Sequence, residues 1–247
     1  RSGCLTLVGE DATGDERLYA RAVCEALGLP LAEGWRDLSR IDIGRSDSAH
    51  LPRPNVRMFF QESRRLAQEA ATATGASAIF NGGGGDHIFC SLQSGAPAAD
   101  RLLTDGPGRS FWKTCQDISL LAPASLTAVA GDAIRRAWLG KPPFRALRDP
   151  ALLSAEAAGK PAEVPHPWLR LPPGALPGKA QQVRLLALAQ GLAEGGDPQD
   201  PLPMASPLLA QPLAEACLRV PSWLWFAGGH NRVVARHAFE GRLPANV

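Results

Sequence analysis

The sequence has few cysteines, no excess of charge of one sign and no long hydrophobic run. Its five cysteines are an odd number without a Cys-x-x-Cys pair, which argues against zinc or disulfide frameworks and is typical of buried thiols in a reducing cytosol. The 26 basic and 24 acidic residues nearly balance, which argues against binding to nucleic acid or to a membrane surface. No apolar stretch approaches the roughly 20 residues of a membrane span, and a signal peptide is absent. We expect a cytoplasmic globular protein that binds neither nucleic acid nor membrane.

Several motifs that carry chemistry are missing as well. The dinucleotide pattern G-x-G-x-x-G fails, because His87 stands at the position of its last glycine. A lysine-bearing phosphate loop and the nucleophile elbow of hydrolases are also absent. The five histidines show no metal spacing, and only His87 and His230, which lie beside glycines, are candidate site residues.

The hydrophobic pattern of the first half predicts alternating strands and helices. Residues 4–8 form a strand candidate, and the apolar spacing from Asp15 to Leu27 predicts a helix that ends at Gly28. A second helix begins near Val56 and ends at Gly75, after an irregular stretch over residues 29–54, and residues 77–80 predict the next strand. This alternation indicates an α/β fold with parallel strands, in which ligands bind at the carboxyl ends of the strands.

The second half is predicted to be mostly helical. Proline and alanine dominate residues 140–178, which we interpret as an extended connector or a surface lobe. We expect an α/β part over residues 1–95 and a helical lobe over residues 96–247, packed against the strands' carboxyl ends. The predicted helices of this lobe cover residues 125–138, 181–193, 212–219 and about 231–240, with a proline-broken loop before residue 212.

Four consecutive glycines, Gly82, Gly83, Gly84 and Gly85, follow the second predicted strand and precede Asp86. Glycines allow positive φ and let backbone amides approach a ligand closely, so the run is suited to a phosphate or pyrophosphate. The acid could hold Mg²⁺ beside the phosphates. A merely structural tight turn is the alternative.

A second glycine pair, Gly228 and Gly229, precedes a predicted helix. Arg232 and Arg236 are one turn apart and would share a face near the start of this helix. Two cations beside a nest of amides form an anion clamp. The alternative is an ordinary pair of solvated arginines.

Together these segments resemble the synthetase domain of the asparagine synthetase family of adenylating ATP-pyrophosphatases. "NGGGGDHIFCSL" overlays the family loop SGEGSDELFGGY, so that Asp86 and Phe89 match. "GHNRVVARHAFEGRLPANV" overlays G-x-x-K-x-x-x-R followed by LP-x-x-V, with Arg232 at the lysine position and Arg236 at the arginine position. "GDERLYARAVCEALGLP" is similar to the helix after the family's second strand.

The departures from the family pattern indicate a particular branch. Gly83 stands where the family has a glutamate tied to asparagine formation. The family's E-x-R-x-P-F-L-D segment is replaced by "PMASPLLAQP", with Pro203, Ala205 and Ala210 in place of charged residues. These features, with the ending "RLPANV", resemble lasso peptide cyclases, which close a macrolactam ring on a ribosomal peptide.

The resemblance implies ATP and Mg²⁺ as cofactors and a peptide as substrate. A side-chain carboxylate of the peptide would be adenylated with release of pyrophosphate, and the peptide's N-terminal amine would then displace AMP. Asp86 would hold Mg²⁺, both glycine segments would bind the nucleotide, and Arg232 and Arg236 would act on the pyrophosphate. Trp223 and Trp225 could shape a peptide pocket, although an ordinary core role is the simpler interpretation. A leader-peptide protease is a candidate partner.

The family's SGG-x-D-S nucleotide loop is missing between Arg1 and Val247. The chain also begins without methionine, directly before a strand. We therefore expect a fragment of a longer ligase that lacks the N-terminal nucleotide loop. The alternatives are a glutamine-hydrolysing asparagine synthetase and a non-catalytic scaffold that binds a peptide or a partner protein.

Overall fold

The computed structural model describes residues 2–11, 14–52, 55, 57–140, 154–156, 167–194 and 199–244. They belong to two compact units: the first comprises residues 1–85, 189–210 and 235–247, and the second comprises the remaining segments, 86–188 and 211–234. Each unit therefore combines segments from both halves of the chain. Most of the predicted connector at 140–178 lies outside the described residues.

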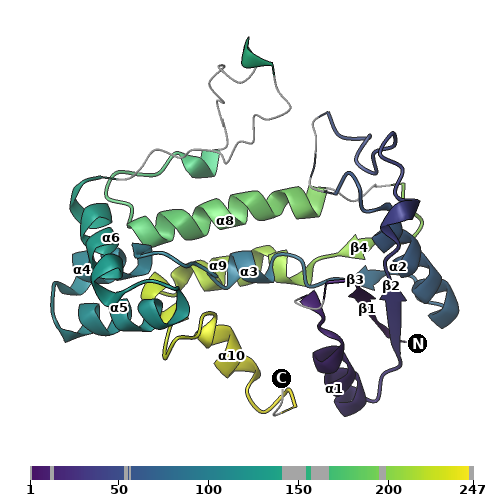
Figure 1. Ribbon diagram of the computed structural model, residues 1–247, viewed down its shortest axis with the longest axis horizontal. Coiled ribbons are helices and arrows are strands. Elements are labelled where there is room, and N and C mark those ends of the chain that lie inside the picture. Colours follow the sequence, from purple (N-terminus) through teal and green to yellow (C-terminus); the bar gives the residue numbers. More distant parts are fainter. Residues whose placement is uncertain are drawn as a thin grey trace. The chain divides into compact units, whose positions relative to one another are not determined.

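Two short parallel sheets form the strand layer of the first unit. β1 (Cys4–Val8) pairs with β2 (Leu31–Trp35), and β3 (Ile79–Phe80) pairs with β4 (Met204–Ala205), as Figure 1 shows. The prediction of parallel strands and a mixed α/β fold is confirmed. The prediction of an irregular stretch over residues 29–54 is wrong at β2, and the predicted loop before residue 212 contains β4.

The sequence of β2, LAEGW, does not predict a strand, because a charged residue and a glycine interrupt its apolar residues. Packing nevertheless favours Gly34, since a Cβ there would lie only 3.2 Å from side-chain atoms of Leu5 and Leu66. Leu66 belongs to α2 (Gln61–Thr74), and its side chain is buried. The glycine thus lets α2 approach the sheet closely.

The helices of the first unit end where the sequence predicts. α1 (Arg17–Leu27) stops at Gly28 with φ of 63°, and α2 stops at Gly75 with φ of 66°. Both glycines adopt the left-handed conformation that side chains disfavour. The described part of the unit also contains the short 3₁₀ helices η2 (Leu38–Arg40) and η4 (Pro207–Leu209).

Glu62 ties the start of α2 to the segment after β2. It is 3% exposed, and its Oε1 accepts hydrogen bonds from Arg65 Nη2 at 2.6 Å and from the Asp37 amide at 3.2 Å. The hydrogen bonds from Arg65 are the main reason that the pKa of Glu62 falls from 4.5 to about 2. A lowered pKa in the folded state stabilises the fold above the unfolded pKa, and this stabilisation is lost as pH falls toward the folded pKa.

The Glu62→Gln variant is expected to be less stable than the parent above pH 4.5 and to lose that difference between pH 4.5 and about 2. Denaturant unfolding of both proteins across this range checks the expectation. A difference in stability that does not change with pH would show that the charge of Glu62 is not involved.

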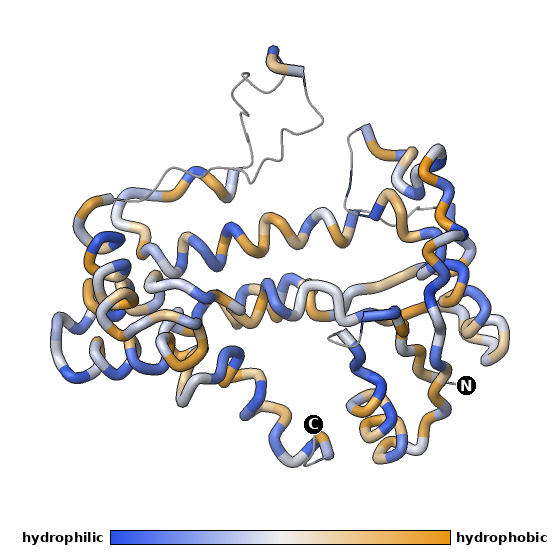
Figure 2. The backbone as a smooth tube through the Cα atoms, in the orientation of Figure 1, coloured by the Kyte–Doolittle hydropathy of each residue, from blue (hydrophilic) through white to orange (hydrophobic). Residues whose placement is uncertain are grey.

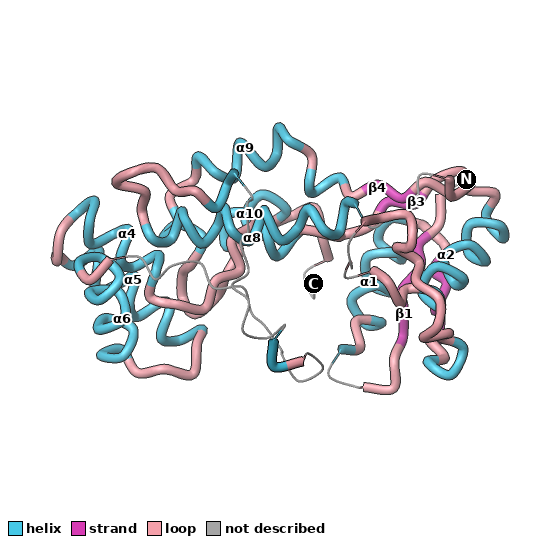
Figure 3. The backbone as a smooth tube through the Cα atoms, turned by 90° about the horizontal axis from the view of Figure 1, so that it is seen from above, coloured by secondary structure: helices cyan, strands magenta, loops and turns pink. Residues whose placement is uncertain are grey.

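The second unit is largely helical. Its helices α4, α5 and α6 pack against one another, as Figure 3 shows. The helices with residues in this unit are α3 (Gly85–Ile88), α4 (Ala96–Asp105), α5 (Arg109–Leu121), α6 (Leu126–Trp138), α8 (Pro177–Glu194), α9 (Gln211–Arg219) and α10 (Val233–Phe239), with 3₁₀ turns η3 (Pro167–Leu169) and η5 (Ser222–Trp225). The predicted helices at 125–138, 181–193, 212–219 and 231–240 are confirmed within a few residues, whereas α4 and α5 are not predicted.

A buried carboxylate joins three segments of this unit. Asp100 of α4 is fully buried and accepts hydrogen bonds from the amides of Gly178 at 2.6 Å and Lys179 at 3.0 Å and from Ser222 Oγ at 2.6 Å. Lys179 Nζ also donates to the Leu218 carbonyl at 2.8 Å. Hydrophobic and hydrophilic residues alternate along α8, which begins at this network (Figure 2).

Replacing Ser222 by alanine is expected to lower the free energy of unfolding by about 2 kcal/mol, because a buried charged acceptor loses one donor. Ser222 is itself fully buried, so water cannot substitute readily. Ser119→Ala is the matched control, since this exposed serine bonds only within its own helix, to the Gln116 carbonyl. Equal losses in the two variants would contradict a special role for the Asp100 network.

Within the described ranges, no single helix combines the length and apolar composition that crossing a membrane requires. α5 and α6 satisfy both only as a pair, and the chain bends by 119° between them.

Candidate functional site

The glycine run forms a fixed turn at the carboxyl end of β3. The carboxamide Oδ1 of Asn81 accepts a hydrogen bond from the Gly83 amide at 2.7 Å and another from Ser206 Oγ at 2.9 Å. The first bond is an Asx-turn, a local signal that the sequence contains and that can be read from an Asn before glycines. The second bond ties the turn to the segment after β4, so the run is not a flexible spacer.

One of the four glycines is required by the fold, and a second is closely packed against a side chain. Gly84 has φ of 91°, and a Cβ there would lie 2.1 Å from the side chain of Leu209. A Cβ on Gly83 would lie 2.6 Å from Asn81 Oδ1. By contrast, no atom comes within 4 Å of a Cβ built on Gly82. Gly82 therefore faces open space, which leaves room for a ligand to approach the backbone.

The amides of the run divide into engaged and unengaged donors. The Gly83 amide binds Asn81, and the Gly85 amide donates to the Gly82 carbonyl at 3.3 Å. The amides of Gly82 and Gly84 have no acceptor among the residues that the structure describes. Two unengaged donors, one of them on a glycine that faces open space, fit a phosphate group.

Asp86 follows the run and belongs to the second unit. Its side chain is 67% exposed, and Oδ1 accepts from Arg232 Nη1 at 2.5 Å. In the described part of the chain, no three His, Cys, Asp or Glu residues come together as a metal site. The protein thus offers one carboxylate, which suits a Mg²⁺ ion only when phosphate oxygens complete its coordination.

Arg232 lies before α10 and not on it. Its φ of 57° is left-handed, which is uncommon for a residue with a side chain. The argument that Arg232 and Arg236 share a helix face is therefore wrong, because only Arg236 is helical. Arg232 Nε also donates to Asn231 Oδ1 at 3.3 Å, and Asn231 Nδ2 donates to Ser91 Oγ at 3.2 Å. These contacts direct the guanidinium toward Asp86.

Gly228 and Gly229 form a tight turn, with φ of 58° and 79°. Ala227 and His230 flank it and exchange backbone hydrogen bonds of 3.1 and 2.9 Å, a pattern that requires positive φ at both central residues. The Gly228 amide donates to Asp117 Oδ1 at 2.8 Å. Because this amide already donates its hydrogen bond to a carboxylate of the protein, the turn has a structural role.

The two tryptophans of η5 also have structural neighbours. Trp225 is 1% exposed, and its ring centroid lies 6.1 Å from that of Phe89. The guanidinium of Arg101 lies 5.1 Å from the ring centroid of Trp223. The interpretation of Trp225 as a core residue is confirmed.

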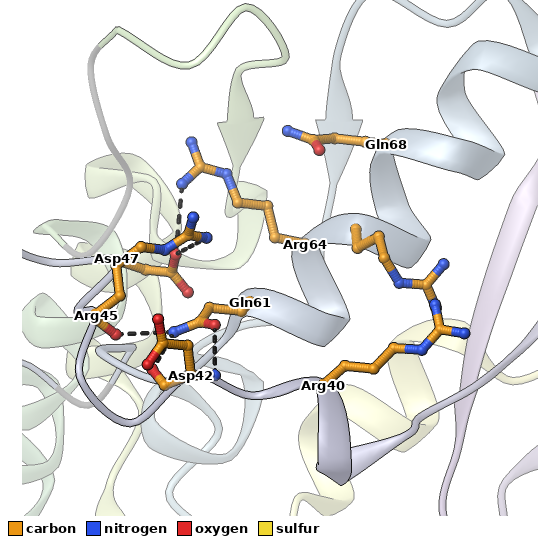
Figure 4. Close-up of a pocket in the computed structure, with 8 residues that line it drawn as sticks. Arg40, Asp42, Arg45, Asp47, Gln61, Arg64 and Gln68 are labelled. Carbon is orange, nitrogen blue, oxygen red and sulfur yellow. Dashed lines mark hydrogen bonds and ion pairs between the residues drawn. The ribbon is translucent and has the colours of Figure 1, made fainter.

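A polar cavity of about 480 Å³ lies beside the start of α2 in the first unit (Figure 4). Arg64 binds Asp200 at 2.5 Å, and Gln61 bonds to backbone groups of Asp42 and Arg45. Its lining residues are Arg40, Asp42, Arg45, Asp47, Gln61, Arg64, Arg65 and Gln68. Acidic groups already accompany most of its arginines, so this cavity is an ion-paired surface feature.

A smaller cavity of about 230 Å³ lies beside the glycine run, within the first unit. Ser206 and Leu209 line this cavity. Ser206 also donates a hydrogen bond to Asn81, and the side chain of Leu209 packs against Gly84. The full lining is Arg57, Leu192, Ala193, Met204, Ser206, Leu209 and Ala210. Arg57 was not predicted as a site residue, because no local sequence pattern shows that residues 192–193 and 204–210 lie beside it.

The family model described as asparagine synthase matches residues 4–247 of the chain. The chain matches no curated protein and no solved structure.

Proposed function

Since the chain belongs to the asparagine synthase family, whose members are ATP-dependent ligases, we propose that it forms a ring-closing amide bond in a peptide. In this proposal, the protein activates an Asp or Glu side chain of the peptide at the α-phosphate of ATP and joins it to the peptide's N-terminal amine. AMP and pyrophosphate are released, as in lasso peptide cyclases. A leader-peptide protease that prepares the substrate is the proposed partner.

The cavity beside the glycine run, whose lining is apolar apart from Arg57 and Ser206, carries this proposal. A glutamate at position 83 would place its Cβ 2.6 Å from Asn81 Oδ1, so the acid tied to asparagine formation would displace the side chain that holds this turn. The described lining contains no acid, whereas the α-ammonium group of free aspartate would need one as a partner. The Asp or Glu side chain of a peptide requires fewer polar contacts than free aspartate does. The α-amino and α-carboxyl groups of that residue are part of peptide bonds and carry no charge.

The residues of the chain have distinct proposed roles. The amides of Gly82 and Gly84 donate to phosphate oxygens, and Asp86 supplies a carboxylate to a magnesium ion that the phosphates carry. Arg232 and Arg236 supply positive charge to the departing pyrophosphate. ATP supplies the leaving group that makes the carboxyl carbon reactive. The apolar lining keeps water from the activated group.

Incubation of the full-length protein with ATP, Mg²⁺ and linear peptides that carry one Asp or Glu tests the proposal. The expected product is lighter than the peptide by one water and resists aminopeptidase, because its N-terminus is closed. Free asparagine from aspartate and a nitrogen donor would identify an asparagine synthetase instead. Peptide binding without ATP consumption would identify a scaffold.

A further inference from the structure

Arg57 is a half-buried cation for which none of the described residues supplies a counter-charge. Of the described residues that line the 230 Å³ cavity, it alone carries a charge, and no described carboxylate forms an ion pair with it. Its Nε is buried without a hydrogen-bond partner, and its Nη1 reaches only Met204 Sδ at 3.2 Å. Thioether sulfur is a weak acceptor. Burial lowers the pKa of Arg57, and no acidic group opposes this effect.

Even partial burial of an isolated charge costs free energy unless a partner compensates the charge. The ring of Phe60, 5.9 Å from the guanidinium, compensates only weakly. The remaining lining is apolar apart from Ser206, whose hydroxyl already donates to Asn81. The fold therefore maintains an unpaired guanidinium that can receive an anion on an apolar stem.

We propose that Arg57 binds the carboxylate of the acidic side chain that the enzyme activates. A guanidinium binds a carboxylate through two parallel hydrogen bonds. The walls formed by Leu192, Met204 and Leu209 suit the methylene groups of Asp or Glu. Because Leu209 also packs on Gly84, a carboxylate held here lies next to the glycine run. The inference rests on the proposed function only in saying that the bound carboxylate is then activated. Binding of the carboxylate by Arg57 does not depend on the proposed function.

The binding test needs neither ATP nor turnover. The probes are N-acetyl-glutamate N-methylamide and its aspartate analogue, titrated by NMR into the full-length protein. The glutamine counterpart and inorganic phosphate serve as comparison ligands. The acids should bind, the glutamine compound should not, and Arg57→Met should weaken acid binding by about tenfold or more, the scale for a hydrogen bond to a charged group. Arg57→Lys should retain part of the affinity.

Arg45→Met is the matched control, since Arg45 is 69% exposed in the other cavity of the same unit and should not affect binding. Thermal unfolding separates a binding role from a structural one. Arg57→Met should be as stable as the parent or more stable, because it removes a half-buried charge that no described residue compensates. Lower stability of this variant would indicate a structural arginine and would overturn the inference.

Equal acid binding by the parent and Arg57→Met, or equal binding of the glutamine compound, would also overturn the inference. So would phosphate that displaces the acids from the parent, since Arg57 would then be a phosphate ligand. If acid binding depends on Arg57 but no peptide is cyclised, the proposed function fails and the inference stands. If cyclisation proceeds while Arg57→Met binds acids normally, only the inference fails.

Discussion

Replacing Asp86 by asparagine in the full-length protein is expected to slow ATP–pyrophosphate exchange by about 10²-fold or more, the scale for losing one electrostatic contribution to a transition state. Asparagine keeps the size of the side chain and removes the charge that a magnesium ion requires. Thermal stability should hardly change, because the side chain is 67% exposed and its ion pair with Arg232 is accessible to water. Exchange assays and thermal unfolding of the same preparations check both expectations.

Asp105→Asn is the matched control, since Asp105 is another acid of the second unit with an arginine partner, Arg101 at 2.5 Å. Its exchange rate should equal that of the parent. Normal exchange by Asp86→Asn at saturating ATP would show that Asp86 only pairs with Arg232.

Arg232→Ala is expected to lower the rate of ATP–pyrophosphate exchange by roughly 10²-fold, while peptide affinity stays the same. The physical reason is the loss of a positive charge where negative charge develops on pyrophosphate. Arg232→Lys should retain part of the rate, because lysine supplies the charge without the planar fork. Exchange rate and peptide affinity are measured on each variant. Weak peptide binding with exchange restored at high peptide concentration would instead assign the arginine to the peptide.

The left-handed backbone at Arg232 provides a further control. Glycine adopts φ of 57° without strain, whereas alanine does so at a cost of about 1 kcal/mol. Arg232→Gly should therefore be at least as stable as Arg232→Ala and equally slow in exchange. Normal exchange by the glycine variant would mean that the backbone conformation, and not the guanidinium, determines the rate.

The features predicted correctly from the sequence are those that depend on neighbouring residues. β1 and the ends of α1 and α2 follow from apolar spacing and from Gly28 and Gly75, because a helix stop is a local event. β4 has only two residues, and its strand character depends on pairing with β3 far away in the sequence. Such a strand has no periodicity of its own.

The candidate site shows the same division. An Asn before a glycine run predicts a turn, and the turn is present at Asn81. The contact of Leu209 with Gly84, and the lack of an acid beside Arg57 among the described residues, depend on where residues 192–193 and 204–210 lie in the fold. Arg232 lies outside the expected helix because its own backbone is left-handed and α10 begins only at Val233. Sequence spacing does not reveal this conformation.

The destination of the carboxylate oxygen tests the central claim most directly. A peptide whose Asp or Glu carboxyl carries ¹⁸O is incubated with the full-length protein, ATP and Mg²⁺, and the nucleotide products are examined by mass spectrometry. If the carboxylate attacks the α-phosphate, each ring closure transfers one ¹⁸O to AMP. Label in inorganic phosphate, accompanied by ADP, would contradict the account, as would AMP that carries no label.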